Sequence, residues 1–105
     1  MDLKKWLDEI KGKGNVAIEI GKLRVKKTTL ERKIAKLHCR LGERVDYLFK
    51  VEKDVMEDDI VKGFIDEIRS IEKEIEEIEK KMELLKAEKA REESEKEQSS
   101  AEEEK

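Results

Sequence analysis

The sequence predicts an all-α protein: an antiparallel two-helix coiled-coil hairpin, with a short N-terminal amphipathic helix and a disordered acidic tail. Two observations predict this class. Half of the 105 residues are charged, only 36% are hydrophobic, and there is no proline. This composition is typical of long exposed helices rather than of a compact globule. In addition, aliphatic residues recur with an average spacing of 3.5 residues over two long segments, which is the repeat of a left-handed coiled coil.

Residues 1–14 are predicted to form a short amphipathic helix that ends in a glycine hinge. Gly12 and Gly14 interrupt the helical pattern. The apolar residues on one side of this helix are expected to dock on the hairpin or on another molecule: Leu3, Trp6, Leu7 and Ile10. A tryptophan among leucines and lysines is also the pattern of an interfacial membrane anchor. The segment is short and contains three acidic residues, so packing on protein is the preferred interpretation.

Residues 15–88 are predicted to form the hairpin. Its first helix begins near Val16, after Asn15 as a cap, and ends near Val51. Steps of four and three residues define its seam: Val16, Ile20, Leu23, Lys27, Leu30, Ile34, Leu37, Leu41, Arg44, Leu48 and Val51. Nine of these eleven positions are aliphatic, so this side of the helix is expected to be buried.

The second helix is predicted from about Asp58 to the high eighties, after a connection at residues 52–57. Its seam is wholly apolar: Val61, Phe64, Ile68, Ile71, Ile75, Ile78, Met82 and Leu85. Two helices of similar length joined by a short connection are expected to pack antiparallel. A register that places Arg40 beside Glu67 also places Lys33 beside Glu74. Such exposed pairs add little stability but help to select the register.

Residues 89–105 contain no apolar seam and end in three consecutive glutamates before Lys105. They are predicted to be frayed helix that passes into disorder.

The first helix carries a second series of small and apolar residues, roughly opposite the seam. We call it the second face, and its predicted partner-binding residues are Ile18, Gly21, Val25, Thr28, Ala35, Cys39, Gly42 and Phe49. Arg32 and Asp46 occupy the two remaining positions of the series. The corresponding outer positions of the second helix are all charged: Lys62, Asp66, Arg69, Lys73, Glu76, Lys80 and Glu83. The first helix is therefore predicted to be buried on two sides, although small residues on a long helix can also face solvent.

The charge is divided unevenly along the chain. Residues 1–53 carry 15 Lys+Arg and 8 Asp+Glu, a net charge of +7, whereas residues 54–105 carry 10 and 20, a net charge of −10. Two halves of opposite sign can attract each other, or the basic half can bind something acidic. The basic run from Lys22 to Arg40 resembles the electrostatic footprint of a phosphate binder. It has no aromatic platform beside it and the whole chain is acidic, so neither nucleic acid nor a membrane surface is the expected partner.

Catalysis is not expected, because no catalytic constellation is present. His38 is the single histidine and is predicted at the edge of the seam, and Cys39 is the single cysteine. One cysteine forms no intrachain disulfide and no zinc-binding pair. There is no phosphate-binding glycine loop, so no cofactor or metal is expected. The sequence has neither a secretory signal nor an apolar run long enough for a membrane span, and a cytoplasmic location is expected.

The stretch from Ile20 through Leu85 resembles a loose group of small bacterial coiled-coil hairpin proteins. The resemblance is carried by Leu41-Gly42 with Tyr47 near the end of the first helix, by the acidic turn, and by the Ile- and Glu-rich second helix. Some members of that group carry a zinc ribbon, and this chain departs from them because it has no cysteine pair. The resemblance implies the hairpin fold and no particular activity.

Together these patterns predict a non-catalytic protein–protein interaction module, such as a scaffold, adaptor or accessory subunit. Its expected partner is a second copy of itself, with a dimer favoured, or another helical protein. The alternative is a peripheral membrane-surface or nucleic-acid binder that uses the basic N-terminal half. Salt separates the two, because binding through phosphates weakens steeply as salt rises.

Overall fold

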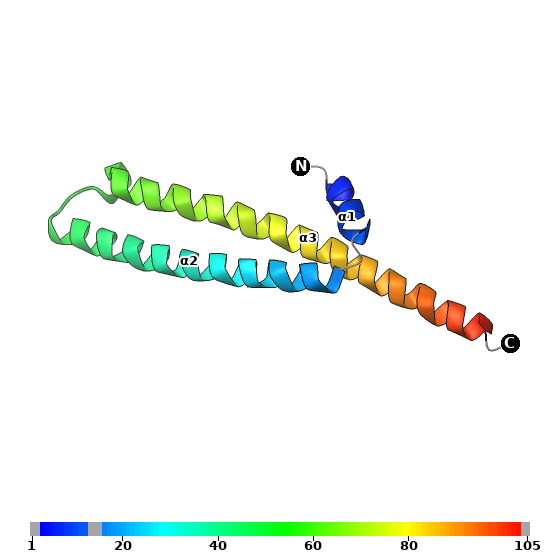
Figure 1. Cartoon of the computed structure of the whole chain (residues 1–105). Helices are drawn as coiled ribbons and strands as arrows, with labels where there is room; N and C mark the ends of the chain where they lie inside the picture. The colour runs from blue at the N-terminus through cyan, green and yellow to red at the C-terminus, as the bar shows by residue number, and fades with distance from the viewer. Residues whose placement is uncertain (1–2, 13–15, 104–105) are drawn as a thin grey trace. The chain divides into compact units, whose positions relative to one another are not determined.

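The computed structural model describes the backbone of residues 3–12 and 16–103 and the side chains of residues 3–11 and 16–94. This part of the chain is helical and contains no strand. Its elements are α1 (Leu3–Gly12), α2 (Val16–Lys50), the short 3-10 helix η1 (Val55–Glu57) and α3 (Asp59–Glu103). Figure 1 labels the three α-helices. The predicted all-α class is confirmed. The predicted hinge at Gly14 and the cap at Asn15 lie outside the described residues.

The ends of the two long helices lie close to their predicted positions, except at the C-terminal end of α3. Helix α3 continues to Glu103, whereas the sequence predicts frayed helix that passes into disorder over residues 89–105. Over residues 89–103 this differs from the prediction. The reason is that Glu, Lys, Ala, Arg and Gln are strong helix formers, and no glycine or proline interrupts them. The described side chains from Lys89 to Ser94 are nevertheless exposed, so this extension is helical without a buried side.

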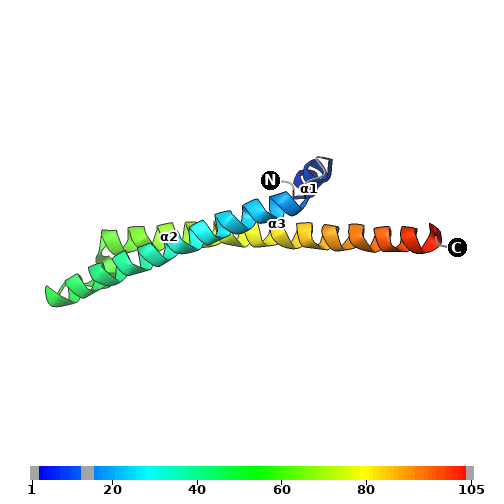
Figure 2. The same cartoon turned by 60° about the horizontal axis from the view of Figure 1, so that its bottom comes forward.

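The chain divides into two compact units. Unit two comprises Lys26–Glu77 and contains the C-terminal part of α2, η1 and the N-terminal part of α3. There α2 and α3 lie side by side and run in opposite directions (Figures 1 and 2). Leu37, Ile68 and Ile71 form the centre of its core, with side chains 4–5% exposed. Half-buried residues pack around them: Leu30, Ile34, Leu41, Phe64 and Ile75. Each fully buried aliphatic side chain contributes about 1.5–3 kcal/mol, which offsets the entropy lost on folding.

The turn of unit two begins with a Schellman motif at the end of α2. The amide of Lys53 donates to the carbonyl of Leu48 at 2.9 Å, and the amide of Glu52 donates to the carbonyl of Phe49 at 3.3 Å. These two bonds satisfy carbonyls that the last turn of a helix leaves without partners. Glu52 adopts the left-handed conformation that the motif requires, with φ of 56°. It is the only non-glycine residue with positive φ in the described chain.

Unit one comprises Met1–Val25 and Ile78–Lys105, and its core has contributions from α2 and α3. The buried hydrophobic residues are Val16, Ile20 and Leu23 from α2 and Ile78, Met82 and Leu85 from α3. Leu85 is fully buried. The predicted docking residues of α1 belong to the same unit and are half-buried: Leu3, Trp6, Leu7 and Ile10.

Candidate partner-binding face

The second face of α2 is exposed to solvent. Phe49, Val25 and Ile18 are 72%, 68% and 56% exposed, values more typical of charged side chains than of large apolar ones. The smaller residues of the face are exposed as well: Gly21, Thr28, Ala35, Cys39 and Gly42. Ile18, Gly21 and Val25 belong to unit one, and the other predicted residues belong to unit two.

The two predicted seams are covered, in contrast to the second face. Every seam position of α2 and α3 is buried or half-buried except Val51, which is 42% exposed. The assignment of Val51 to the buried seam is therefore wrong. Helix α2 ends at Lys50, so Val51 follows the last helical residue and no longer shares the direction of the seam. The charged outer positions of α3 are all exposed, as expected.

A group of exposed apolar residues surrounds the turn of unit two, and sequence reasoning did not identify it. We call it the turn-end group: Tyr47, Phe49, Val51, Met56 and Ile60, which are 42–77% exposed. Of these, only Phe49 was among the predicted partner-binding residues. One sequence signal was present, because Ile60 directly precedes the seam residue Val61 and so points elsewhere on the helix.

The turn is held by an ion pair between α2 and the start of α3. Arg44 donates from Nη2 to Oδ1 of Asp58 at 2.8 Å and from Nε to Oδ2 at 3.1 Å. Asp58 also caps α3, because its Oδ2 accepts from the amide of Val61 at 3.0 Å. The hydrogen bond from Arg44, with a smaller contribution from the Val61 amide, lowers the pKa of Asp58 to about 2. The Arg44 guanidinium also lies over the Tyr47 ring, 5.1 Å from its centroid.

The expected pairs of Arg40 with Glu67 and of Lys33 with Glu74 are not among the ion pairs of the described part of unit two. Arg44 with Asp58 is an ion pair that joins the two helices there. Two further ion pairs lie within α2, between Lys27 and Glu31 and between Asp46 and Lys50.

Helix α1 contacts α3 through its polar residues as well as its apolar side. Nζ of Lys81 lies 5.2 Å from the centroid of the Trp6 ring, a cation–π contact. Nζ of Lys11 lies 2.9 Å from Oε2 of Glu88, whose side chain is only 9% exposed. The other carboxylate oxygen of Glu88 accepts from Arg91 at 3.1 Å. In the same unit Val16 and Ile20, at the start of α2, are buried, whereas Ile18 between them is 56% exposed.

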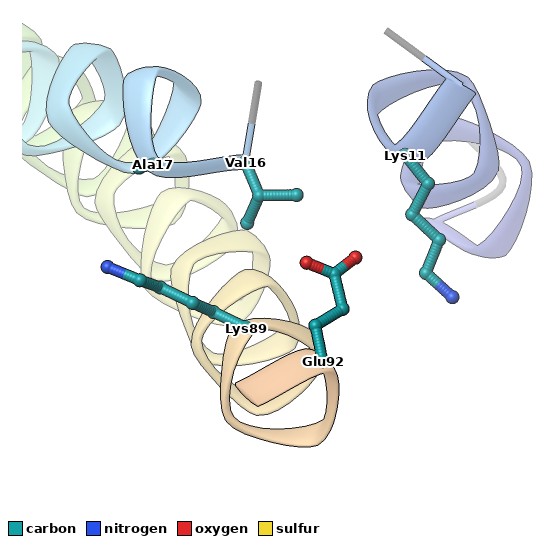
Figure 3. A pocket seen from close by; sticks show the side chains of 5 residues that line it. All are labelled: Lys11, Val16, Ala17, Lys89 and Glu92. Atoms are coloured by element: carbon teal, nitrogen blue, oxygen red, sulfur yellow. The ribbon is translucent and has the colours of Figure 1, made fainter. Parts of the chain in front are cut away.

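A small pocket lies in unit one where α1, α2 and α3 meet. Figure 3 shows Lys89 and Glu92 on α3, beside Val16 and Ala17 at the start of α2, with Lys11 on α1 opposite. Its lining combines two amines, one carboxylate and two aliphatic side chains. Among the described side chains, no group of three or more His, Cys, Asp or Glu residues is placed to hold a metal ion.

Comparison with family models, with curated proteins and with solved structures found no match to this chain. None of the described helices is both long and apolar enough to cross a membrane.

Proposed function

We propose that this chain is a non-catalytic protein–protein interaction module of the cytoplasm, which self-associates or packs on a partner helix through the second face of α2. Its role is that of a scaffold, adaptor or accessory subunit. One observation carries the proposal: the second face presents apolar side chains such as Val25 and Phe49 to solvent, whereas the outer positions of α3 are charged. Exposed apolar surface of this kind marks interaction sites.

The proposed framework for this face is an antiparallel coiled-coil hairpin of α2 and α3, with α1 docked beside it. The burial of both seams supports it, since a 3.5-residue repeat that is covered along its length is what such a hairpin needs. The half-buried apolar residues of α1 and the Lys11–Glu88 ion pair support the docking of α1.

The glycines of α2 also support a partner on the second face. A side chain at Gly21 or Gly42 would meet nothing within 4 Å. Each glycine inside a helix costs about 0.5–1 kcal/mol relative to alanine, and nothing within a single chain compensates for this cost here. A second helix that packs closely against the glycines would compensate for it. Gly63 of α3 is equally open, which makes it a useful control rather than a second argument.

The experiment that tests the proposal is a measurement of solution mass by light scattering over a concentration series, on the wild type and on Ala35→Glu. We expect an oligomer that Ala35→Glu dissociates, with helical content retained in circular dichroism, because Ala35 is exposed in the single chain. Ala90→Glu is the matched control, since Ala90 is also exposed and lies on α3. An oligomer whose mass Ala35→Glu leaves unchanged contradicts the use of this face.

The alternative function is binding of a polyanion by the basic part of α2. It is favoured by the exposure of Lys33, Lys36 and Arg40, none of which belongs to an ion pair of the described residues. Titration with a short DNA duplex and with anionic vesicles, at low and high salt, tests it. Binding that weakens steeply with salt supports the alternative. Self-association through apolar contacts is expected to persist at high salt.

A further inference from the structure

Two opposite charges interrupt the second face within unit two, and their spacing is symmetric. Arg32 and Asp46 lie seven residues before and seven residues after Cys39, all on α2. At 1.5 Å per residue, each charge is about 10.5 Å along the helix from the cysteine. Both charged side chains are exposed, as is Cys39.

The symmetry matters because an interface between two copies related by a two-fold axis is self-complementary: if residue i contacts residue j, residue j also contacts residue i. When two α2 helices run antiparallel with the axis beside Cys39, Arg32 of each copy lies opposite Asp46 of the other. Both charges are then matched. In a parallel pair, Arg32 would face Arg32 and Asp46 would face Asp46, and both contacts would be repulsive.

We propose that the partner of the second face is a second copy of this chain, packed antiparallel along α2 with the two-fold axis beside Cys39. The inference rests on the proposed function and specifies its partner and geometry. It is carried by the complementary charges of Arg32 and Asp46 on a face that a single chain leaves uncovered.

The other residues of the face in unit two fit the same register. Ala35 lies opposite Glu43 of the second copy, and Gly42 of that copy is one residue, about 1.5 Å, further along the helix, so small side chains meet near the axis and permit close approach. Phe49 lies opposite Thr29 of the second copy, beside Thr28, which covers an aromatic ring that is 72% exposed in the single chain. Burial of apolar surface of this kind supplies the affinity, and the charges select the direction.

Asp46 retains the capacity to accept from an arginine of the second copy. Within the chain its Oδ2 lies 2.9 Å from Nζ of Lys50, and both side chains are more than 60% exposed. The carboxylate has a second oxygen, and a planar guanidinium can bind one or both oxygens of a carboxylate. None of the ion pairs among the described residues involves Arg32.

A charge-reversal experiment tests the direction of packing. Arg32→Asp places two acidic pairs across an antiparallel interface, and Asp46→Arg places two basic pairs there. We expect each variant alone to raise the dissociation constant roughly tenfold, and an equimolar mixture of the two to restore association, since both cross-pairs are then attractive. Lys62→Asp and Asp66→Arg, which reverse the same charges on the outer side of α3, serve as controls. Circular dichroism checks that all variants stay helical.

Disulfide trapping tests the register independently. In a Cys39→Ser background, Ala35→Cys and Gly42→Cys are oxidised separately and as a mixture. The proposed geometry predicts a disulfide between the two variants in the mixture and little crosslinking of either alone. Crosslinking of each variant with itself would indicate a parallel dimer and overturn the inference.

The outcomes separate this inference from the proposed function. A dimer that Ala35→Glu dissociates, but that neither charge reversal affects, would overturn the antiparallel arrangement and leave the second face as the interface. A wild-type chain that is monomeric at all concentrations would overturn the inference, and the proposed function would then require a different helical protein on this face. An oligomer unaffected by Ala35→Glu would contradict both.

Discussion

Arg44 holds Asp58 across the turn of unit two, with Nη2 2.8 Å from Oδ1 and Nε 3.1 Å from Oδ2. The same carboxylate accepts the amide of Val61 and so caps α3. One side chain therefore joins the end of α2 to the start of α3 and also satisfies a backbone donor that the first turn of a helix leaves without a partner.

The first prediction concerns pH. The pKa of Asp58 is lowered to about 2 in the folded chain, from its ordinary value of 3.8. A carboxyl whose pKa is lowered by folding stabilises the fold above its unfolded pKa, and this contribution is lost as the pH falls through the folded pKa. The contribution of Asp58 should thus be complete above about pH 4 and disappear towards pH 2. Thermal melts followed by circular dichroism between pH 2 and pH 7 measure it.

Asp58→Asn is the variant that isolates this effect. Asparagine can still cap α3 but carries no charge for Arg44. We expect Asp58→Asn to melt at a lower temperature than the wild type at pH 7 and to approach it near pH 2. Parallel curves for the two proteins over the whole pH range would show that the ion pair does not act in this way.

The second prediction concerns Glu52, whose φ of 56° is unfavourable for any residue with a Cβ. The left-handed conformation costs such a residue about 1–2 kcal/mol, and glycine adopts it without that cost. Glu52→Gly should therefore stabilise the chain by roughly 1 kcal/mol, less the larger entropy that glycine loses on folding. A urea or thermal melt measures the change. Glu52→Ala removes the same carboxylate but keeps the Cβ, so a comparable gain in that variant would rule out backbone conformation as the cause.

The sequence was sufficient to predict the helical class, both seams and the location of the turn. The periodicity of the aliphatic residues was the basis of these predictions, because the same side of a helix is buried over many successive turns. It did not predict how far α3 extends, since a charged segment without a seam can be either helical or disordered, and propensity alone does not decide between them. Val51 was wrongly assigned to the buried seam for a local reason. A hydrophobic repeat does not show where a helix ends, and here α2 ends at Lys50, just before Glu52 adopts a left-handed conformation.

The third prediction concerns the core of unit two. Leu37 is 4% exposed and packs with Ile68 and Ile71. Truncation of a buried leucine to alanine removes transfer free energy and leaves a cavity, at a cost of about 2–5 kcal/mol. Leu37→Ala should lower the free energy of unfolding by that amount in denaturant titrations. Val25→Ala serves as the control, because Val25 is 68% exposed and its truncation should change little in the monomer. Equal effects of the two substitutions would contradict the assignment of Leu37 as buried and Val25 as exposed.

The candidate site was only partly accessible from sequence. The second face could be found because small and apolar residues recur along α2 at helical spacing. The rest of the turn-end group could not, since residues such as Met56 lie outside any repeat and their exposure depends on the turn itself. Glu88 was missed as well: the repeat continues from Leu85 to Lys89, which is exposed, whereas Glu88, one residue earlier, is buried although it is charged.

The fourth prediction concerns the docking of α1. Glu88 is buried beside Lys11, so Glu88→Gln removes the charge that attracts this lysine. We expect the equilibrium between docked and detached α1 to shift about tenfold towards the detached form. The reason is that a hydrogen bond to a charged group contributes about 1.5–3 kcal/mol, and Lys11 is the residue through which α1 makes this ion pair. Trp6 is the single tryptophan, so acrylamide quenching of its fluorescence reports on this contact. Glu93→Gln, at an exposed position of α3, is the matched control. Identical quenching in the two variants would show that the ion pair does not hold α1.

The last prediction concerns the end of α3. The sequence beyond Leu85 lacks an apolar seam, and the described side chains from Lys89 to Ser94 are exposed. Helix without a buried side adds little to stability, since most helical stability in proteins comes from tertiary packing. Deletion of residues 90–105 should therefore leave the melting temperature within about 2 °C of the wild type, even though it removes the Arg91 hydrogen bond to Glu88. Deletion of residues 84–105, which also removes the fully buried Leu85, should lower it clearly. A comparable drop in both truncated chains would mean that the charged extension packs against the rest of the protein or against a second copy.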